Sequence, residues 1–353
     1  MDETNTEITK PAKTRLGAVM STLSSWPVRL LGTGLCLWFL FAHIDVAQSL
    51  RVISHADLRL VAVAAVGTFL VLMCAMAEWA VLIRSATEVP WSKLNYSFWK
   101  SLAPGHLLPT GFGGDASRIY DMCGDTGAAA ATAATFIGRL GSTSALMFWA
   151  LLASIELHNT LAIAASAVSL VVMLGMWLTG MAPNAVALWL VGLTRRMSYR
   201  APRAILRLAQ ELKELRSNRN SIFLSMLISL VGWGVQNWTL SLLARAVGIA
   251  VPWYLFAMAV PFSLIATMAP FALNGYGLRE GILVAILLKA GLTAANAAAV
   301  ALLVDLQMVP FIAFSALMWL RSDIIPSSKA VAENAHDIEE RSVGGRGKRF
   351  VGR

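Results

Sequence analysis

Charged residues are scarce in this sequence. Of 353 residues, Asp, Glu, Lys and Arg together make up 14%, whereas about 25% is usual for a soluble domain. Hydrophobic residues make up 57%, and the mean hydropathy is +0.64. These values exclude a soluble enzyme. They predict an all-α, polytopic membrane protein, because the apolar runs lack the short alternating segments of a membrane β-barrel.

The sequence also lacks the motifs of metal-binding and nucleotide-binding proteins. Its three cysteines include no C-x-x-C pair and its five histidines no H-E-x-x-H spacing, so neither a thiolate site nor a zinc hydrolase is indicated. No G-x4-G-K-S/T phosphate loop is present, so ATP-driven transport by this chain alone is not expected. The net charge of +9 reflects basic residues between apolar runs, which is typical of membrane orientation. We therefore expect no metal, no cofactor and no nucleic-acid partner.

Eight apolar runs are candidate membrane spans, since a helix needs about 20 apolar residues to cross a bilayer. They predict a helical bundle of about eight spans. The runs cover residues 27–47, 60–83, 127–156, 160–180, 221–246, 253–272, 280–293 and 295–320.

Lys and Arg are unevenly divided between the two sides that these spans define. If the N-terminus is cytoplasmic, few basic residues fall on the outer side, namely Arg51, Arg59, Arg245 and Lys289. Because positive loops resist translocation, this pattern predicts a multi-pass protein of the cell membrane with both termini in the cytoplasm.

The predicted organisation is a single membrane domain with a polar tail at each end. Residues 1–25 form a cytoplasmic polar tail, 26–320 the membrane domain and 321–353 a disordered basic tail. The membrane domain divides into halves of about 26–180 and 221–320.

A basic cytoplasmic segment, 181–220, joins the two halves. Within it, residues 203–216 predict an amphipathic surface helix, because Leu208, Leu212 and other apolar residues recur at helical spacing opposite charged ones. Such a helix is expected to lie on the inner leaflet as a connector.

The first unusual stretch runs from Pro104 to Tyr120 and contains prolines and glycines that cannot continue a helix. Gly113 and Gly114 precede Asp115, which we expect to be a helix N-cap with Arg118 in the first turn. A helix N-terminus beside an arginine is an anion site, since free N–H groups and the guanidinium both face the ligand.

The second stretch, Pro270 to Glu280, repeats this design. Asn274, Gly275 and Gly277 interrupt the apolar sequence, and Arg279 again lies in the first turn of the following helix. Broken helices at corresponding positions of two halves point to a transporter binding site. The segments are either complete loops or re-entrant, and an internal repeat is possible. Alternatively, each arginine only neutralises a neighbouring carboxylate at an interfacial turn.

Other polar residues also lie within apolar runs. Arg139 requires a partner, because a charge there costs at least about 2.5 kcal/mol. Asp305 is the expected counter-charge; Glu78 is another candidate, or else marks the interface. His106 is either a hydrogen-bonded structural residue or a proton relay. Three amides, Gln236, Asn237 and Asn296, are expected to be interhelical hydrogen-bonding residues.

These motifs resemble those of the flippase-like family named for the transmembrane region of lysylphosphatidylglycerol synthetase. The family's Pro–Gly–Gly–Asp–x–x–Arg motif corresponds to Pro109–Arg118, and its Pro–x–x–x–Gly–x–Gly–x–Arg–Glu motif to Pro270–Glu280. This chain departs from the family by having Gly138 where an acidic residue is common and Asp305 where an arginine is common. Since only residues 321–353 follow the last span, the aminoacyl-transfer domain is expected to be absent.

The resemblance implies movement of a lipid with a charged or glycosylated head group between leaflets. Our primary hypothesis is a translocase without its own ATPase that binds a lipid phosphate, and we expect it not to be an enzyme. The expected phosphate-binding residues are Arg118, Arg279, Gly113, Gly114, Gly275, Gly277 and Asn274. Those expected to orient the arginines, gate transport or couple it to protons are Asp115, Glu280, Arg139, Asp305 and His106.

Two alternatives belong to other functional classes. A membrane-embedded transferase could use a polyprenyl-phosphate sugar donor, although the predicted outer loops are short. A non-catalytic scaffold would instead bind a glycosyltransferase or another lipid-modifying enzyme as its partner. The oligomeric state is left open by the sequence.

Overall fold

A computed structural model describes residues 26–42, 46–108, 112–178, 201–267, 272 and 274–321. Within these ranges the chain forms α-helices joined by turns, without a β-strand, as the predicted all-α class requires. The N-terminal tail, the C-terminal tail beyond Arg321 and the first part of the basic connecting segment lie outside the described residues, and so do the predictions made for them.

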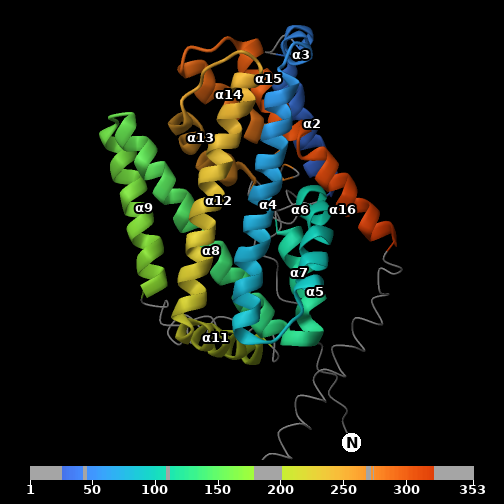
Figure 1. The fold of residues 1–353 in the computed structure, drawn as a ribbon, viewed down its shortest axis with the longest axis vertical. Helices are drawn as coiled ribbons and strands as arrows, with labels where there is room; N and C mark the ends of the chain where they lie inside the picture. The colour runs from blue at the N-terminus through green and yellow to red at the C-terminus, as the bar shows by residue number, and fades with distance from the viewer. Residues whose placement is uncertain are drawn as a thin grey trace, which may run out of the picture.

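Four long apolar segments have the length and composition of membrane spans. They correspond to four of the eight predicted runs. They are α4 (Leu58–Ala86), α8 (Ala128–Glu156), α12 (Arg219–Ala246), and the pair α15 (Ala294–Leu306) and α16 (Val309–Arg321). Shorter apolar helices, α2 (Trp26–Ala42) and α9 (Thr160–Leu178), lie at the edges of the bundle (Figure 1).

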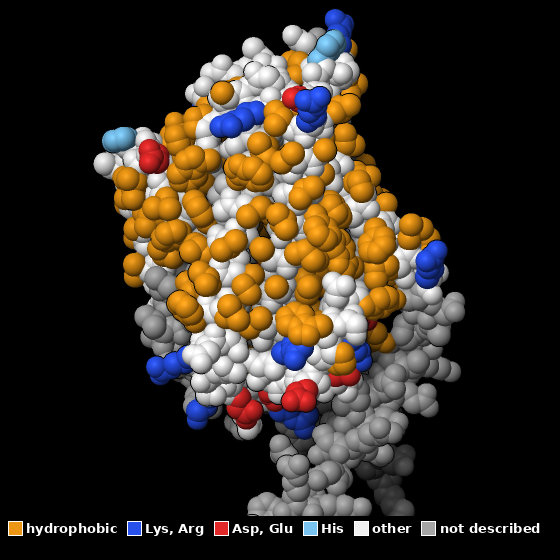
Figure 2. Space-filling model, in the orientation of Figure 1, with side chains coloured by type: hydrophobic (Ala, Val, Ile, Leu, Met, Phe, Trp, Pro, Cys, Tyr) orange, Lys and Arg blue, Asp and Glu red, His pale blue; other side chains and the backbone are white. Residues whose placement is uncertain are grey.

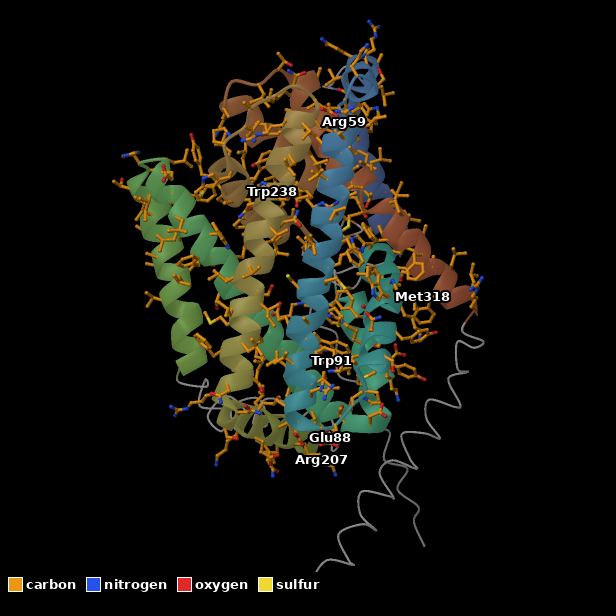
Figure 3. The ribbon with its side chains drawn as sticks, in the orientation of Figure 1. Arg59, Glu88, Trp91, Arg207, Trp238 and Met318 are labelled. Atoms are coloured by element: carbon orange, nitrogen blue, oxygen red, sulfur yellow. The ribbon has the colours of Figure 1, made fainter. Side chains whose placement is uncertain are left out.

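Helices α4 and α12 form the centre of the bundle, where they lie side by side in opposite directions (Figure 1). The Asp57 N–H, just before α4, donates to the carbonyl of Ala246 at the end of α12 at 2.7 Å. Gly67 permits the close approach, because a Cβ there would lie 2.3 Å from the Thr239 hydroxyl oxygen. Figure 3 marks the two ends of the bundle by Arg59 and by Arg207. We call these the Arg59 end and the Arg207 end.

The first broken motif folds into a helical hairpin that enters and leaves at the Arg207 end (Figure 1). The hairpin consists of α5 (Trp91–Lys100), α6 (Leu102–Leu107) and α7 (Gly113–Thr126). The break between α5 and α6 is held by Ser315 of α16. The Ser315 hydroxyl oxygen accepts from the Ala103 N–H at 2.8 Å, and the hydroxyl donates to the Lys100 carbonyl at 2.9 Å.

The second broken motif forms a hairpin that starts from the opposite, Arg59 end (Figure 1). Its helices are α13 (Trp253–Thr267) and α14 (Leu278–Lys289). At 15 and 12 residues, they extend only about 22 and 18 Å, less than the roughly 30 Å of a bilayer core. The predicted sixth and seventh spans are therefore two arms of one hairpin, and a count of eight spans is not established.

The two halves repeat one plan in inverted order. In the first, α4 descends to the Arg207 end, the hairpin follows there, and α8 returns (Figure 1). In the second, α12 rises to the Arg59 end, its hairpin follows there, and α15 runs back (Figure 1). Of the arrangements open to the sequence, the structure thus shows hairpins and the pattern of an inverted repeat, which is common in transporters.

The surface carries an apolar belt between two charged ends. Figure 2 shows hydrophobic side chains covering the middle of one face, with charged side chains gathered above and below. The predicted amphipathic helix is present as α11 (Ala201–Ser217) and crosses the Arg207 end (Figure 1). Leu208 and Leu212 pack against the core, whereas Arg207 is exposed. A belt of this kind fits a protein embedded in a bilayer.

Candidate functional site

Helix α7 starts earlier than the sequence predicted. Phe112 is its N-cap residue and Gly113 its first residue, so the expectation that Asp115 is the N-cap is wrong. Asp115 lies within the first turn and Arg118 in the second. The reason is steric: a Cβ on Gly113 would lie 2.3 Å from the Pro104 carbonyl oxygen. The glycine therefore lets α7 begin directly against α6.

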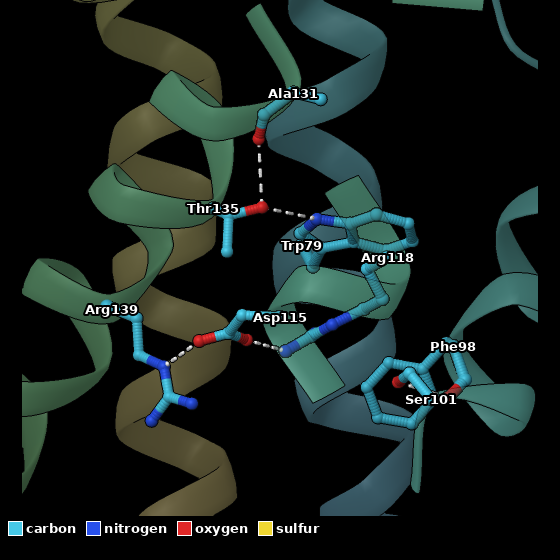
Figure 4. Close-up of polar contacts among 8 residues, drawn as sticks. All are labelled: Trp79, Phe98, Ser101, Asp115, Arg118, Ala131, Thr135 and Arg139. Atoms are coloured by element: carbon cyan, nitrogen blue, oxygen red, sulfur yellow. Dashed lines mark hydrogen bonds and ion pairs between the residues drawn. The ribbon is translucent and has the colours of Figure 1, made fainter. Parts of the chain in front are cut away.

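Asp115 is the centre of the first charge cluster (Figure 4). Its side chain is about 8% exposed and forms ion pairs with Arg118 and with Arg139 of α8, the latter at 2.7 Å between Oδ2 and Nε. The prediction that Arg139 pairs with Asp305 is thus wrong. The hairpin brings Asp115 to α8, a proximity that spacing along the chain does not reveal.

The guanidinium of Arg118 is also held by aromatic rings. Its Cζ lies 5.4 Å from the centre of the Trp79 ring and 5.5 Å from that of Phe98, within the range of a cation–π interaction. The Trp79 indole is fixed in turn, because its N–H donates to the Thr135 hydroxyl at 3.3 Å (Figure 4). Among the described residues, the Arg118 Nε has no hydrogen-bond partner.

Glu78 joins this cluster although the sequence favoured an interfacial position for it. The residue is 7% exposed within α4, and the charges of Arg118 and Arg139 act on its carboxyl group. The signal available in the sequence was a lone acidic residue in an apolar run, which is functional by default. The neighbouring Trp79 and Arg84 suggested an interface instead.

The second charge cluster is built around Arg279 at the start of α14. Arg279 lies in the first turn of the helix, as predicted. It pairs with Glu280 at 3.0 Å and with Asp305 of α15. Asp305 is therefore the partner of Arg279 and not of Arg139. Glu280 has a second role, because its Oε2 accepts from the Gly277 N–H at 2.5 Å and caps the helix.

The turn before α14 depends on unusual backbone conformations. Gly275 and Gly277 have φ values of 70° and 84°, which favour glycine. A Cβ on Gly277 would lie 2.6 Å from the Cβ of Cys36 in α2. Asn274 also has a positive φ, 45°, and is buried. These glycines pack closely against neighbouring segments, and their predicted binding to phosphate stays a prediction.

Two cavities adjoin these clusters. The first has a volume of about 330 Å³, and its lining includes Glu78, Asp115, Arg118, Arg139 and Gly114. The second has a volume of about 240 Å³, and its lining includes Gln236, Arg279, Glu280 and Asp305. His106, Leu264 and Thr267 line both cavities, so the two spaces adjoin.

The cavities join the two sequence motifs at the centre of the bundle. Asn274 of the second motif lines the first cavity, and His106 of the first motif lines both. The ring nitrogen Nδ1 of His106 lies 2.9 Å from the Leu102 carbonyl, as the structural interpretation of this histidine predicts. Arg118 and Arg279 line different cavities. The structure therefore presents two adjoining arginine sites instead of one joint clamp.

The described residues contain no cluster of three or more His, Cys, Asp or Glu side chains suited to a metal ion.

The predicted interhelical hydrogen-bonding role of Asn237 is wrong, since neither polar atom of its side chain has a hydrogen-bond partner among the described residues.

Four long apolar helices and two opposed hairpins around charged cavities define a polytopic helical membrane protein. The chain belongs to the family of the lysylphosphatidylglycerol synthase TM region, whose sequence profile matches residues 26–316. This membership confirms the resemblance noted in the sequence and supports a membrane role related to lipids. No curated protein and no solved structure matches the chain.

Proposed function

We propose that this protein is a lipid translocase that moves a phospholipid or a polyprenyl-phosphate-linked head group between leaflets without an ATPase of its own. The observation that carries the proposal is the meeting of two hairpins, one from each end of the bundle, at adjoining cavities lined by arginines. A lipid head group that crosses a bilayer needs a polar environment at mid-depth, while its acyl chains stay in the apolar phase.

In this proposal the arginines bind the lipid phosphate in succession. Arg118 receives the phosphate in the first cavity, together with Arg139, and Arg279 receives it in the second. Guanidinium groups suit this role because they bind phosphate oxygens through two parallel hydrogen bonds. Asp115 and Glu280 hold the arginines in place between events, and Asp305 and His106 gate the passage between the cavities.

The proposed address is the cell membrane with the Arg207 end in the cytoplasm. Arg51, Arg59, Arg245 and Lys289 then face outward, whereas the basic helix α11 lies at the inner surface. This orientation follows the positive-inside rule. In this orientation, a lipid reaches the first cavity from the cytoplasmic side, where the first hairpin starts, and the second cavity from the outer side, where the second hairpin starts.

Flipping in liposomes that contain the purified protein tests the proposal. The probes are head-group-labelled phospholipids, aminoacylated phosphatidylglycerol and a polyprenyl phosphate. We expect protein-dependent flipping of one class, and its loss in the Arg118→Ala/Arg279→Ala double variant. The Arg59→Ala/Arg245→Ala variant is the matched control, because both of these arginines are exposed near one end of the bundle.

The same experiment distinguishes the rival functions. Turnover of a sugar donor without flipping would favour a membrane-embedded transferase. Folded protein that moves none of the probes, but co-purifies with a glycosyltransferase or lipid-modifying enzyme, would favour a scaffold.

A further inference from the structure

The charges around the two cavities are already paired. Arginines line both cavities, and each has at least one carboxylate partner: Asp115 for Arg118 and Arg139, and both Glu280 and Asp305 for Arg279. Glu78 differs from these carboxylates. Within the described part of the chain, no Lys, Arg or His nitrogen forms an ion pair with it inside 4 Å.

Glu78 nevertheless faces the first cavity and its charges. Glu78 lines that cavity, together with Asp115 and Arg118 of α7, Arg139 of α8 and His106 of α6. On the same helix, Cys74 lies one turn from Glu78, and the charge of Glu78 acts on its thiol group. From α12, the neutral hydroxyl of Ser229 faces it. Among the described residues that line this cavity or act on Glu78, these are the titratable and charged ones.

Two glycines of α8 keep the space beside this carboxyl group open. A Cβ on Gly138 would lie 3.7 Å from the Glu78 Oε1, and one on Gly141 would lie 3.9 Å from it. Larger side chains at these positions would cover the oxygen. The two glycines therefore leave room beside the Glu78 carboxyl group.

A phosphate that enters the first cavity meets a balanced set of charges. The two arginines there are matched by Asp115 and Glu78, so a further negative charge is uncompensated. Such a charge in a site of low dielectric constant is strongly unfavourable unless it is neutralised. Protonation of Asp115 would break two ion pairs, whereas protonation of Glu78 breaks none.

We propose that Glu78 takes up one proton when an anionic lipid enters the first cavity. The proton and the lipid then cross the membrane in the same direction. The carboxylate binds a proton from the water on the side of lipid entry. It releases that proton to the opposite side when the phosphate leaves, which restores the carboxylate. Each cycle is electrically neutral. The inference rests on the proposed translocase function and supplies its driving force.

A pH gradient across liposomes that contain the protein tests this coupling. The membrane potential is clamped with potassium and valinomycin, and the gradient is about two pH units, which corresponds to about 2.7 kcal/mol for one proton. We expect labelled phosphatidylglycerol to accumulate several-fold in the leaflet facing the alkaline side, and labelled phosphatidylcholine to show no response. A pH-sensitive dye in the lumen should report proton movement during phosphatidylglycerol flipping by the wild-type protein.

Two glutamate variants test whether Glu78 is the residue that carries the proton. Glu78→Gln mimics the protonated form, so we expect slower flipping whose leaflet ratio no longer follows the gradient. Glu88→Gln, an exposed glutamate at the Arg207 end, should keep the wild-type response. Wild-type flipping that ignores the gradient and moves no protons would overturn the coupling while leaving the translocase intact. A full response in Glu78→Gln would overturn the assignment to this residue, and absence of all flipping would overturn both proposals.

Discussion

The carboxylate of Asp115 binds Arg139 at 2.7 Å although the two residues lie on different helices, α7 of the first hairpin and the long span α8. Because the same carboxylate also pairs with Arg118, a single acidic residue fixes the tip of the hairpin to the span. The geometry of the first cavity therefore depends on one side chain.

Replacing Asp115 with Asn should damage both fold and transport. The amide cannot neutralise two guanidinium groups, and breaking a buried ion pair, here the one with Arg118, typically costs about 3–5 kcal/mol. The pair with Arg139 contributes less, because the Arg139 side chain is 45% exposed. We expect flipping to fall by at least about tenfold and the unfolding temperature in detergent to drop. Asp125→Asn is the control, since Asp125 lies at the end of the same helix and pairs with Lys93 at the surface. Equal behaviour of the two variants would contradict the central role of Asp115.

The glycines of α7 provide a test of close helix packing. A Cβ at Gly113 would meet the Pro104 carbonyl at 2.3 Å, whereas one at Gly124 would meet no atom within 4 Å. We expect Gly113→Ala to destabilise the protein and abolish flipping. Gly124→Ala should be neutral or stabilising by up to about 1 kcal/mol, because alanine favours a helix. Thermal unfolding of both variants measures the difference, and a well-folded Gly113→Ala protein would show that α6 and α7 do not touch as described.

Arg279→Lys tests whether the second site needs a guanidinium. Arg279 contacts Glu280 and Asp305 from different nitrogens, and its Cζ lies 5.0 Å from the centre of the Tyr276 ring. A lysine keeps the charge but has no planar fork. We expect normal folding with flipping reduced by about tenfold or more. If the rate in liposomes stays at the wild-type level, a simple positive charge is sufficient there.

Asn237 offers a prediction about stability alone. Its side chain is 2% exposed, and both polar atoms lack a partner within the described residues. An unsatisfied buried polar group costs about 1–3 kcal/mol. Asn237→Leu should therefore raise the unfolding temperature and leave flipping unchanged. A lower unfolding temperature would mean that a molecule such as water satisfies the amide in the native protein.

Apolar length and glycine pattern were sufficient to predict the class, the long spans, the surface helix over 203–216 and the placement of Arg279 at a helix start. These features are local, so they can be predicted from neighbouring residues. The arms of the second hairpin were overestimated as spans. The sixth run, 253–272, continues past the end of α13 at Thr267, and the seventh, 280–293, was counted as a span although it is shorter than the usual crossing length. Hydropathy alone does not separate a span from a helix that turns back.

The partners of the charges could not be predicted in the same way. Arg139 and Asp305 were the conspicuous charges within apolar runs, so opposite sign suggested a pair. The fold instead gives Arg139 to Asp115 and Asp305 to Arg279. Glu78 was underestimated for a related reason: its interfacial neighbours are adjacent in sequence, whereas the arginines it faces come from α7 and α8. Such proximities are set by tertiary packing.

The hydrogen bonds of Ser315 determine when the first hairpin can be completed during synthesis of the protein. The Ala103 N–H and the Lys100 carbonyl at the break of the first hairpin both bond to Ser315, more than 200 residues later. Trp319 also donates to the Lys100 carbonyl at 2.8 Å. A nascent chain that has inserted its first half still lacks these bonds. The first hairpin therefore reaches its final form only after the ribosome has produced α16, although its own residues are translated long before.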